Sequence, residues 1–191
     1  MSLRSLCLLG TALCLLSSAT VLPAVESHGY AIPDQADLAG TTVPLRGADL
    51  LKWKWVVSLY VAGLYVPAGT APTAAAAVAV SPKRLLMHYA RDIPREKMVE
   101  ATDECLGLNI TAEQRTALQA SLTTWNALYP APKEDQVVTF DHLAGGTLIM
   151  SLDGKELGRI TDEAFARALF AIWIGEHPVK ESLRDTMIGA P

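Results

Sequence analysis

The stretch Gly145 to Val179, GGTLIMSLDGKELGRITDEAFARALFAIWIGEHPV, holds the features that decide the fold. Thr147 to Leu152 is apolar and rich in β-forming residues, and Lys155 to Ile160 can return beside it as a second strand. Between them lies Asp153-Gly154, a dipeptide that a two-residue type I′ turn favours. The stretch therefore predicts a β-hairpin.

A helix is predicted directly after this hairpin. Thr161 can cap its N-terminus, and the acidic Asp162 and Glu163 suit the positive end of the helix dipole. Gly175 and Pro178 end the helix, since glycine favours the position after a helix and proline cannot continue one. Four large apolar side chains share one face of it: Phe165, Leu169, Ile172 and Trp173.

Residues 1–24 have the composition of a secretory signal peptide. Arg4 precedes an apolar run, Ser5 to Leu16, and small residues follow that run. Cleavage after Ala19 is the alternative to cleavage after residue 24. We therefore expect residues 25–191 to form the mature domain and to be exported, to the periplasm if the source is a Gram-negative bacterium.

The rest of the composition indicates a single acidic domain. The chain has 191 residues, about one ordinary domain, and a formal net charge of −4, which argues against a nucleic-acid partner. No second apolar run is long enough to span a membrane, so we expect no transmembrane anchor in the mature chain. Cys7 and Cys14 leave with the signal peptide. The remaining Cys105 is at helical spacing from Met98 and Thr102, and we expect it in the core without a disulfide.

The segment Lys52 to Pro67, KWKWVVSLYVAGLYVP, has an alternating pattern that predicts one long strand. Trp53 and Trp55 lie on one face of this strand, where we expect them to pack in the core. Tyr60 lies on the other face, in the part that we expect to be covered. This second face is polar at one end and apolar at the other, so only part of it is predicted to be covered.

Further strands and helices follow along the chain. A short helix is predicted over Thr73 to Val80, and another after Pro94, whose fixed φ suits the first helical position. A third begins at Thr111, where Gln114 has the spacing of a capping box, and a last amphipathic helix is predicted over Pro178 to Gly189. The order strands, two helices, strands, two helices indicates an α+β fold, with helices packed on one face of a largely antiparallel sheet.

Three segments resemble the bacterial chalcone isomerase-like family: LYVAGLYVP at Leu59 to Pro67, the Asp and Gly series from Asp135 to Phe165, and IWIGEHPVKESL at Ile172 to Leu183. The similarity covers nearly all of the mature chain. It implies a curved antiparallel sheet backed by helices, with an apolar cleft between them. It also implies several functions, because plant members close a chalcone to a flavanone without a cofactor, plastid relatives bind fatty acids, and others lack catalysis.

The resemblance places three positions of the plant site on this chain. Leu51 stands where an arginine stabilises the phenolate, and Arg46 nearby either substitutes for it or is a solvated charge at the strand edge. Tyr60 replaces a threonine and keeps a hydroxyl donor, although such a tyrosine could equally bond to the backbone. Ile172, followed by Trp173, replaces a small polar residue. Efficient chalcone cyclisation is therefore not expected, since losing one oxyanion donor costs roughly 3 kcal/mol.

These residues favour an exported protein that binds a small apolar or amphipathic ligand, such as a fatty acid, without catalysis. Tyr60 and Arg46 would meet its polar end, and Leu51, Ile172 and Trp173 would line the apolar part. One alternative is a cofactor-independent isomerase that uses Tyr60 as a proton donor on a phenolic or enone substrate. Another is a structural or partner-binding role in the envelope, with the cleft filled by its own side chains. No metal or other cofactor is expected, since no ligand motif occurs and the histidines are scattered: His28, His88, His142 and His177.

Overall fold

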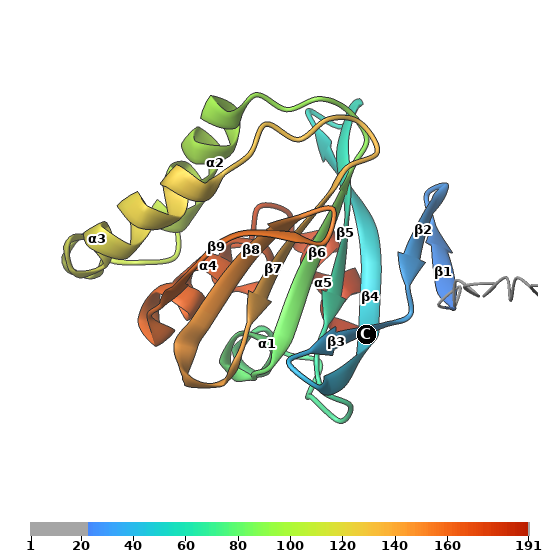
Figure 1. Ribbon diagram of the computed structural model, residues 1–191, viewed down its shortest axis with the longest axis horizontal. Coiled ribbons are helices and arrows are strands. Elements are labelled where there is room, and N and C mark those ends of the chain that lie inside the picture. The colour runs from blue at the N-terminus through green and yellow to red at the C-terminus, as the bar shows by residue number, and fades with distance from the viewer. Residues whose placement is uncertain (1–22, 191) are drawn as a thin grey trace, which may run out of the picture.

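The computed structural model describes residues 23–190, so the predicted signal peptide lies almost entirely outside the described part. Within residues 23–190, seven strands form one antiparallel sheet whose order follows the chain, β3-β4-β5-β6-β7-β8-β9. The sheet is strongly curled (Figure 1). Its strands are β3 (Gln35–Leu38), β4 (Thr41–Trp53), β5 (Val57–Tyr65), β6 (Lys83–Tyr89), β7 (Val137–His142), β8 (Thr147–Leu152) and β9 (Lys155–Thr161). A separate hairpin, β1 (Ala24–Ser27) and β2 (Tyr30–Pro33), precedes them.

The helices pack on one face of this sheet. They are α1 (Ala74–Ala79), α2 (Arg95–Gly107), α3 (Ala112–Leu128), α4 (Glu163–Ile174) and α5 (Glu181–Ile188), and a single 3-10 turn covers Ala144–Gly146. All five helices contribute side chains to one core cluster with the inner face of the strands. In Figure 1, α4 and α5 lie behind the sheet and α2 and α3 lie together at one side. The predicted α+β class, with a curved antiparallel sheet and helices on one face, is confirmed.

A second, smaller core lies on the opposite face of the sheet. There side chains of β2 and β3 pack against β4, β5 and β6. Its largest buried side chain is Tyr65, whose hydroxyl donates to the Pro33 carbonyl at 2.7 Å. The sheet therefore has a core on each face, and the cleft that the sequence predicts between sheet and helices corresponds to the helix-side core.

The hairpin β8–β9 forms where it was predicted, with Asp153 and Gly154 both at positive φ. The predicted cap of the helix that follows is wrong by one residue. Thr161 still belongs to β9, opposite Thr147, and Asp162 is the N-cap, its carboxylate accepting the Phe165 N–H at 3.0 Å. A threonine that completes a strand ladder has an extended backbone, so the next polar residue takes the capping position.

The prediction of one long strand over Lys52 to Pro67 is wrong. β4 ends at Trp53, the chain turns, and β5 begins at Val57, so this segment is the tip of a hairpin. Trp53 and Trp55 are consequently 55% and 82% exposed instead of packed in the core. The alternating pattern runs through the turn without Gly, Asn or Pro, and therefore gives no sign of it.

No helix of residues 23–190 combines the length and the apolar character needed to cross a bilayer.

Candidate functional site

Four of the five predicted ligand-binding residues meet between the sheet and the helices. Leu51 on β4 is directly opposite Tyr60 on β5, and both face the helix-side core. From α4, Trp173 donates its Nε1–H to the Tyr60 hydroxyl at 2.9 Å. Ile172 belongs to the same core and is 3% exposed. The structure thus places apolar side chains beside one half-buried hydroxyl.

Arg46 does not join this group. It is the extra residue of a β-bulge near the other end of β4, where Leu45 pairs with Tyr65. Its Nε donates to the Ile188 carbonyl at 3.1 Å, which fastens the C-terminus of α5 to the strand. A cation at a helix C-terminus is stabilised by the carbonyls there. The geometry therefore gives Arg46 a structural contact and leaves the polar end of the site without a guanidinium at Tyr60.

Three further hydroxyl groups lie in this layer, and we call Tyr60, Tyr89, Tyr129 and Thr102 the hydroxyl cluster. Tyr89 on β6 is directly opposite Tyr60, with their ring centroids 5.3 Å apart. Tyr129, after α3, shares a hydrogen bond with Thr102 of α2 at 2.7 Å. Tyr89 lies within a predicted strand, but its register against Tyr60 was not predicted, and nothing in the sequence places Tyr129 beside Thr102.

Two phenol protons of the cluster lack a strong acceptor. Among residues 23–190, the Tyr60 hydroxyl accepts from Trp173, and no protein acceptor receives its proton. The Tyr89 hydroxyl donates to sulfur atoms alone, to Met98 Sδ at 3.8 Å and Met87 Sδ at 4.0 Å. Thioether sulfur is a weak acceptor, so both protons remain available to an oxygen acceptor.

Burial keeps the phenols of the cluster protonated. Loss of solvent raises the pKa of Tyr60 despite the hydrogen bond from Trp173, and it raises the pKa of Tyr89 in the same way. It also raises the pKa of Tyr129 to about 12. The half-buried thiol of Cys105 on α2 has a raised pKa for the same reason, which makes it a poor nucleophile. The cluster can therefore donate hydrogen bonds but offers no base and no reactive thiolate.

Aromatic rings fill the space around these hydroxyls. Phe140 on β7 lies 5.8 Å from Trp173, 5.2 Å from Trp125 and 6.0 Å from Tyr129, measured between ring centroids. Trp125 is fully buried, and its Nε1–H has no partner among the described residues. An unpaired buried donor is uncommon and calls for an explanation. This side of the core is therefore aromatic, with one N–H, that of Trp125, without a partner within hydrogen-bond distance in the described part of the chain.

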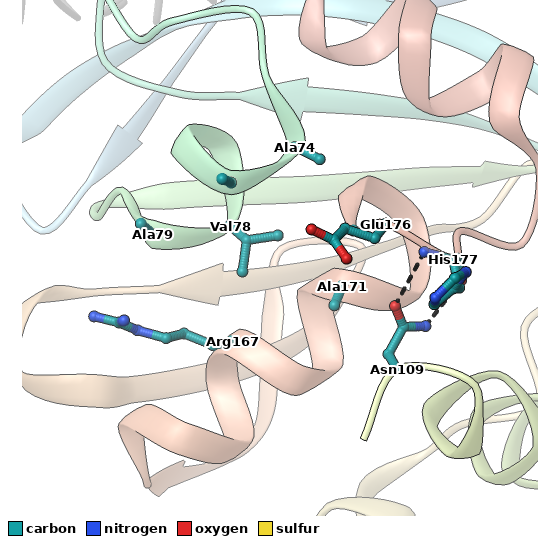
Figure 2. A pocket seen from close by; sticks show the side chains of 10 residues that line it. Ala74, Val78, Ala79, Asn109, Arg167, Ala171, Glu176 and His177 are labelled. Atoms are coloured by element: carbon teal, nitrogen blue, oxygen red, sulfur yellow. Dashed lines mark hydrogen bonds between the residues drawn. The ribbon is translucent and has the colours of Figure 1, made fainter. Parts of the chain in front are cut away.

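Two grooves lie on the outer surface of the helices, away from Tyr60. The first, about 290 Å³, runs between α1 and α4 up to the loop after α4 (Figure 2). The second, about 400 Å³, adjoins it along α3 and α4. Two of their polar side chains are already hydrogen-bonded: Arg167 Nε donates to Glu163 at 2.7 Å, and Asn109 donates to the His177 carbonyl at 2.9 Å. Both grooves are therefore separate from the hydroxyl cluster.

Comparisons with known proteins agree with this architecture. The family model described as chalcone isomerase-like matches residues 24–189. Among solved structures, a fatty-acid binding protein from Arabidopsis thaliana is similar in fold, with a TM-score of 0.61 and 14% identity. The similarity covers 84% of this chain and 92% of that chain. No curated protein matches the chain significantly. At this identity, the likeness to the solved structure shows the fold alone.

Proposed function

Because the chain belongs to the chalcone isomerase-like family, we propose that it binds a small apolar or amphipathic ligand between its sheet and its helices, and that this ligand is a fatty acid. The carboxylate would accept hydrogen bonds from Tyr60 and Tyr89, and the chain would lie along Leu51, Ile172 and Trp173. The solved neighbour named as a fatty-acid binding protein supports this ligand class.

The observation that carries the proposal is a pair of phenol protons, on half-buried Tyr60 and buried Tyr89, that have no oxygen acceptor among residues 23–190. A carboxylate accepts such protons strongly, because hydrogen bonds to a charged acceptor are about twice as strong as neutral ones. Tyr89 donates at present to Met87 and Met98, and exchanging sulfur for a carboxylate oxygen would improve that bond. Methionine side chains also adapt readily to an inserted chain.

The ligand needs space that side chains now fill, and α2 is the element best suited to provide it. Its buried side chains form one row along the helix: Met98, Thr102 and Leu106. In Figure 1, α2 and α3 lie together at one side of the molecule, joined to the strands by extended segments. An outward displacement of these two helices would open the hydroxyl cluster without breaking the sheet.

Removing one hydroxyl should weaken binding of palmitate to protein freed of lipid. We expect Tyr60→Phe and Tyr89→Phe each to lower the affinity about tenfold, since a hydrogen bond to a charged group contributes roughly 1.5 kcal/mol or more. Isothermal titration calorimetry would measure this. Tyr30→Phe is the matched control, because Tyr30 packs on the opposite face beside His88.

The ligand itself provides a second control. Methyl palmitate has the same chain without the carboxylate, so its affinity should depend less on Tyr60 and Tyr89. If palmitate does not bind, or binds equally well to all of these variants, the proposal is wrong.

We propose binding without turnover because the cation needed by an isomerase does not reach the phenol. Among residues 23–190, no guanidinium is hydrogen-bonded to Tyr60, and Leu51 faces it instead. Negative charge that develops on a substrate oxygen would accept a hydrogen bond from Tyr60 but would have no cation beside it in this apolar layer. If the protein is instead an isomerase with Tyr60 as proton donor, chalcone absorbance should decay faster with the protein than without it. We expect equal decay rates.

We further propose that the chain is exported. The apolar run from Ser5 to Leu16 after Arg4 supports a signal peptide. N-terminal sequencing of protein produced with its own leader should give a mature chain that starts after Ala24 or Ala19. An intact first residue would contradict export by this route.

A further inference from the structure

The tip of the β4–β5 hairpin presents large apolar side chains to solvent. Trp53, Trp55 and Val56 are 55%, 82% and 79% exposed. Three such side chains at one hairpin tip are unusual, since hairpin turns are normally polar. An exposed apolar group of this kind commonly marks an interaction site.

The backbone of the tip shows that stability does not explain these residues. Lys54 and Trp55 both have positive φ, 48° and 68°, a conformation that disfavours side chains with a β-carbon. Three other hairpins among residues 23–190 also have two consecutive positive-φ residues in the turn, and glycine is the second of them: His28-Gly29, Ala39-Gly40 and Asp153-Gly154. Trp55 therefore occupies a position where this chain elsewhere uses glycine, so the tip keeps its indole at an energetic cost.

Each exposed indole has a lysine ammonium group close to its ring. Lys54 Nζ lies 4.5 Å from the centre of the Trp53 ring, and Lys180, from the segment before α5, lies 5.7 Å from that of Trp55. Lys52 is also exposed, and Glu181 is the acidic residue next to Lys180 in the sequence. In a chain of net charge −4, this end of the molecule carries a local excess of positive charge.

We propose that the β4–β5 tip docks on the surface of a bilayer that contains anionic lipids. Indole rings favour the boundary between headgroups and acyl chains, and lysines beside them bind anionic headgroups. Trp53, Trp55 and Val56 are exposed together at the end of one hairpin, so they can enter a lipid interface at once, which favours a bilayer over an acidic protein. The inference does not depend on the proposed fatty-acid site. That site is close to the tip in sequence, since Tyr60 lies three residues beyond the start of β5.

Vesicle co-sedimentation tests this inference on the protein as purified. We expect binding to vesicles of phosphatidylcholine with about 30% phosphatidylglycerol and little binding to phosphatidylcholine alone, because each lysine near an anionic surface contributes about 1 kcal/mol. Raising NaCl from about 0.05 to about 0.5 M should weaken the binding by screening. Brominated lipids should quench tryptophan fluorescence if the indoles enter the headgroup boundary.

Variants separate docking from folding. Trp55→Gly should lower the apparent affinity about tenfold by removing apolar area from the tip. The melting temperature should stay equal or rise, because glycine suits the positive φ. Lys52→Gln with Lys54→Gln should lower the affinity about twenty-five-fold. Matched controls are Leu108→Ser, at a residue 64% exposed on another surface, and Lys155→Gln at the β8–β9 turn, and both should bind as wild type.

Two results would overturn the proposal. One is the absence of wild-type binding to the anionic vesicles. The other is binding that the tip variants retain in full. If the first result is accompanied by tryptophan-dependent binding to polyglutamate, the tip instead binds an acidic protein partner.

Discussion

Gly47→Ala should destabilise the fold by about 3 kcal/mol or more, as an overpacked backbone contact does. Gly47 lies on β4 where α5 crosses the strand, directly after the bulge at Arg46. A β-carbon there would overlap the Thr186 carbonyl oxygen and come within 3.1 Å of the Met187 Cα. These are backbone atoms, so no rotamer change can relieve the contact, and α5 would have to move away from the sheet.

A thermal melt measures this effect. For a domain of this size, 1 kcal/mol corresponds to roughly 2–4 °C, so the melting temperature should fall by about 6–12 °C. Gly107→Ala is the control, because an added β-carbon at this exposed helical position meets nothing within 4 Å. We expect it to raise stability by about 0.5 kcal/mol by restricting the unfolded chain. Equal melting temperatures for both variants would show that α5 does not pack on β4 as described.

The parts of the fold that sequence predicts are those governed by local chemistry. Asp153-Gly154 fixes a turn because its backbone preference is strong, and the hairpin forms there. Thr111 and Gln114 form the expected capping box at the start of α3, since both bonds lie within four residues. In each case, the energies that decide the structure come from neighbours in sequence.

The sequence does not predict the β4–β5 turn or the full set of residues at the site, because local preferences do not determine either of them. Lys54 and Trp55 adopt a turn conformation against their own preference, so alternation predicts a strand instead. Arg46 lies near Leu51 in sequence, but the bulge and α5 direct its side chain to the Ile188 carbonyl. Tyr89 joins Tyr60 through strand register, which a single sequence does not specify.

The unfolding free energy of the protein should rise with pH between about 7 and 9 because of a buried lysine on β6. Lys83 is fully buried, and its Nζ donates to the carbonyls of Val78 at 2.6 Å and Val80 at 2.8 Å, at the end of α1. The ring of Phe170 lies 4.8 Å from the same nitrogen. Sequence reasoning missed this residue because lysine is rarely buried without an acidic partner.

Burial lowers the pKa of Lys83 to about 7, which outweighs the opposing effect of Glu163. The unfolded chain keeps the ordinary value near 10.5, so between these two pH values it holds the extra proton. Unfolding then takes up a proton, and stability increases as pH rises through this window. Below pH 7 both states are charged, and the slope from Lys83 disappears. His142, whose pKa burial also lowers, adds a similar slope at lower pH.

Lys83→Met should remove this slope while keeping the apolar stem against Phe170. From pH 7 to 9 we expect the unfolding free energy of the wild type to gain about 2 kcal/mol relative to the variant. Urea unfolding at several pH values measures the difference in unfolding free energy between the two proteins. The contributions of the titrating groups that both proteins share cancel in this difference. Lys155→Met, at an exposed turn, should keep the slope of the wild type. If Lys83→Met keeps it as well, Lys83 is charged in the folded protein, and α1 must hold its cation through the carbonyls of Val78 and Val80.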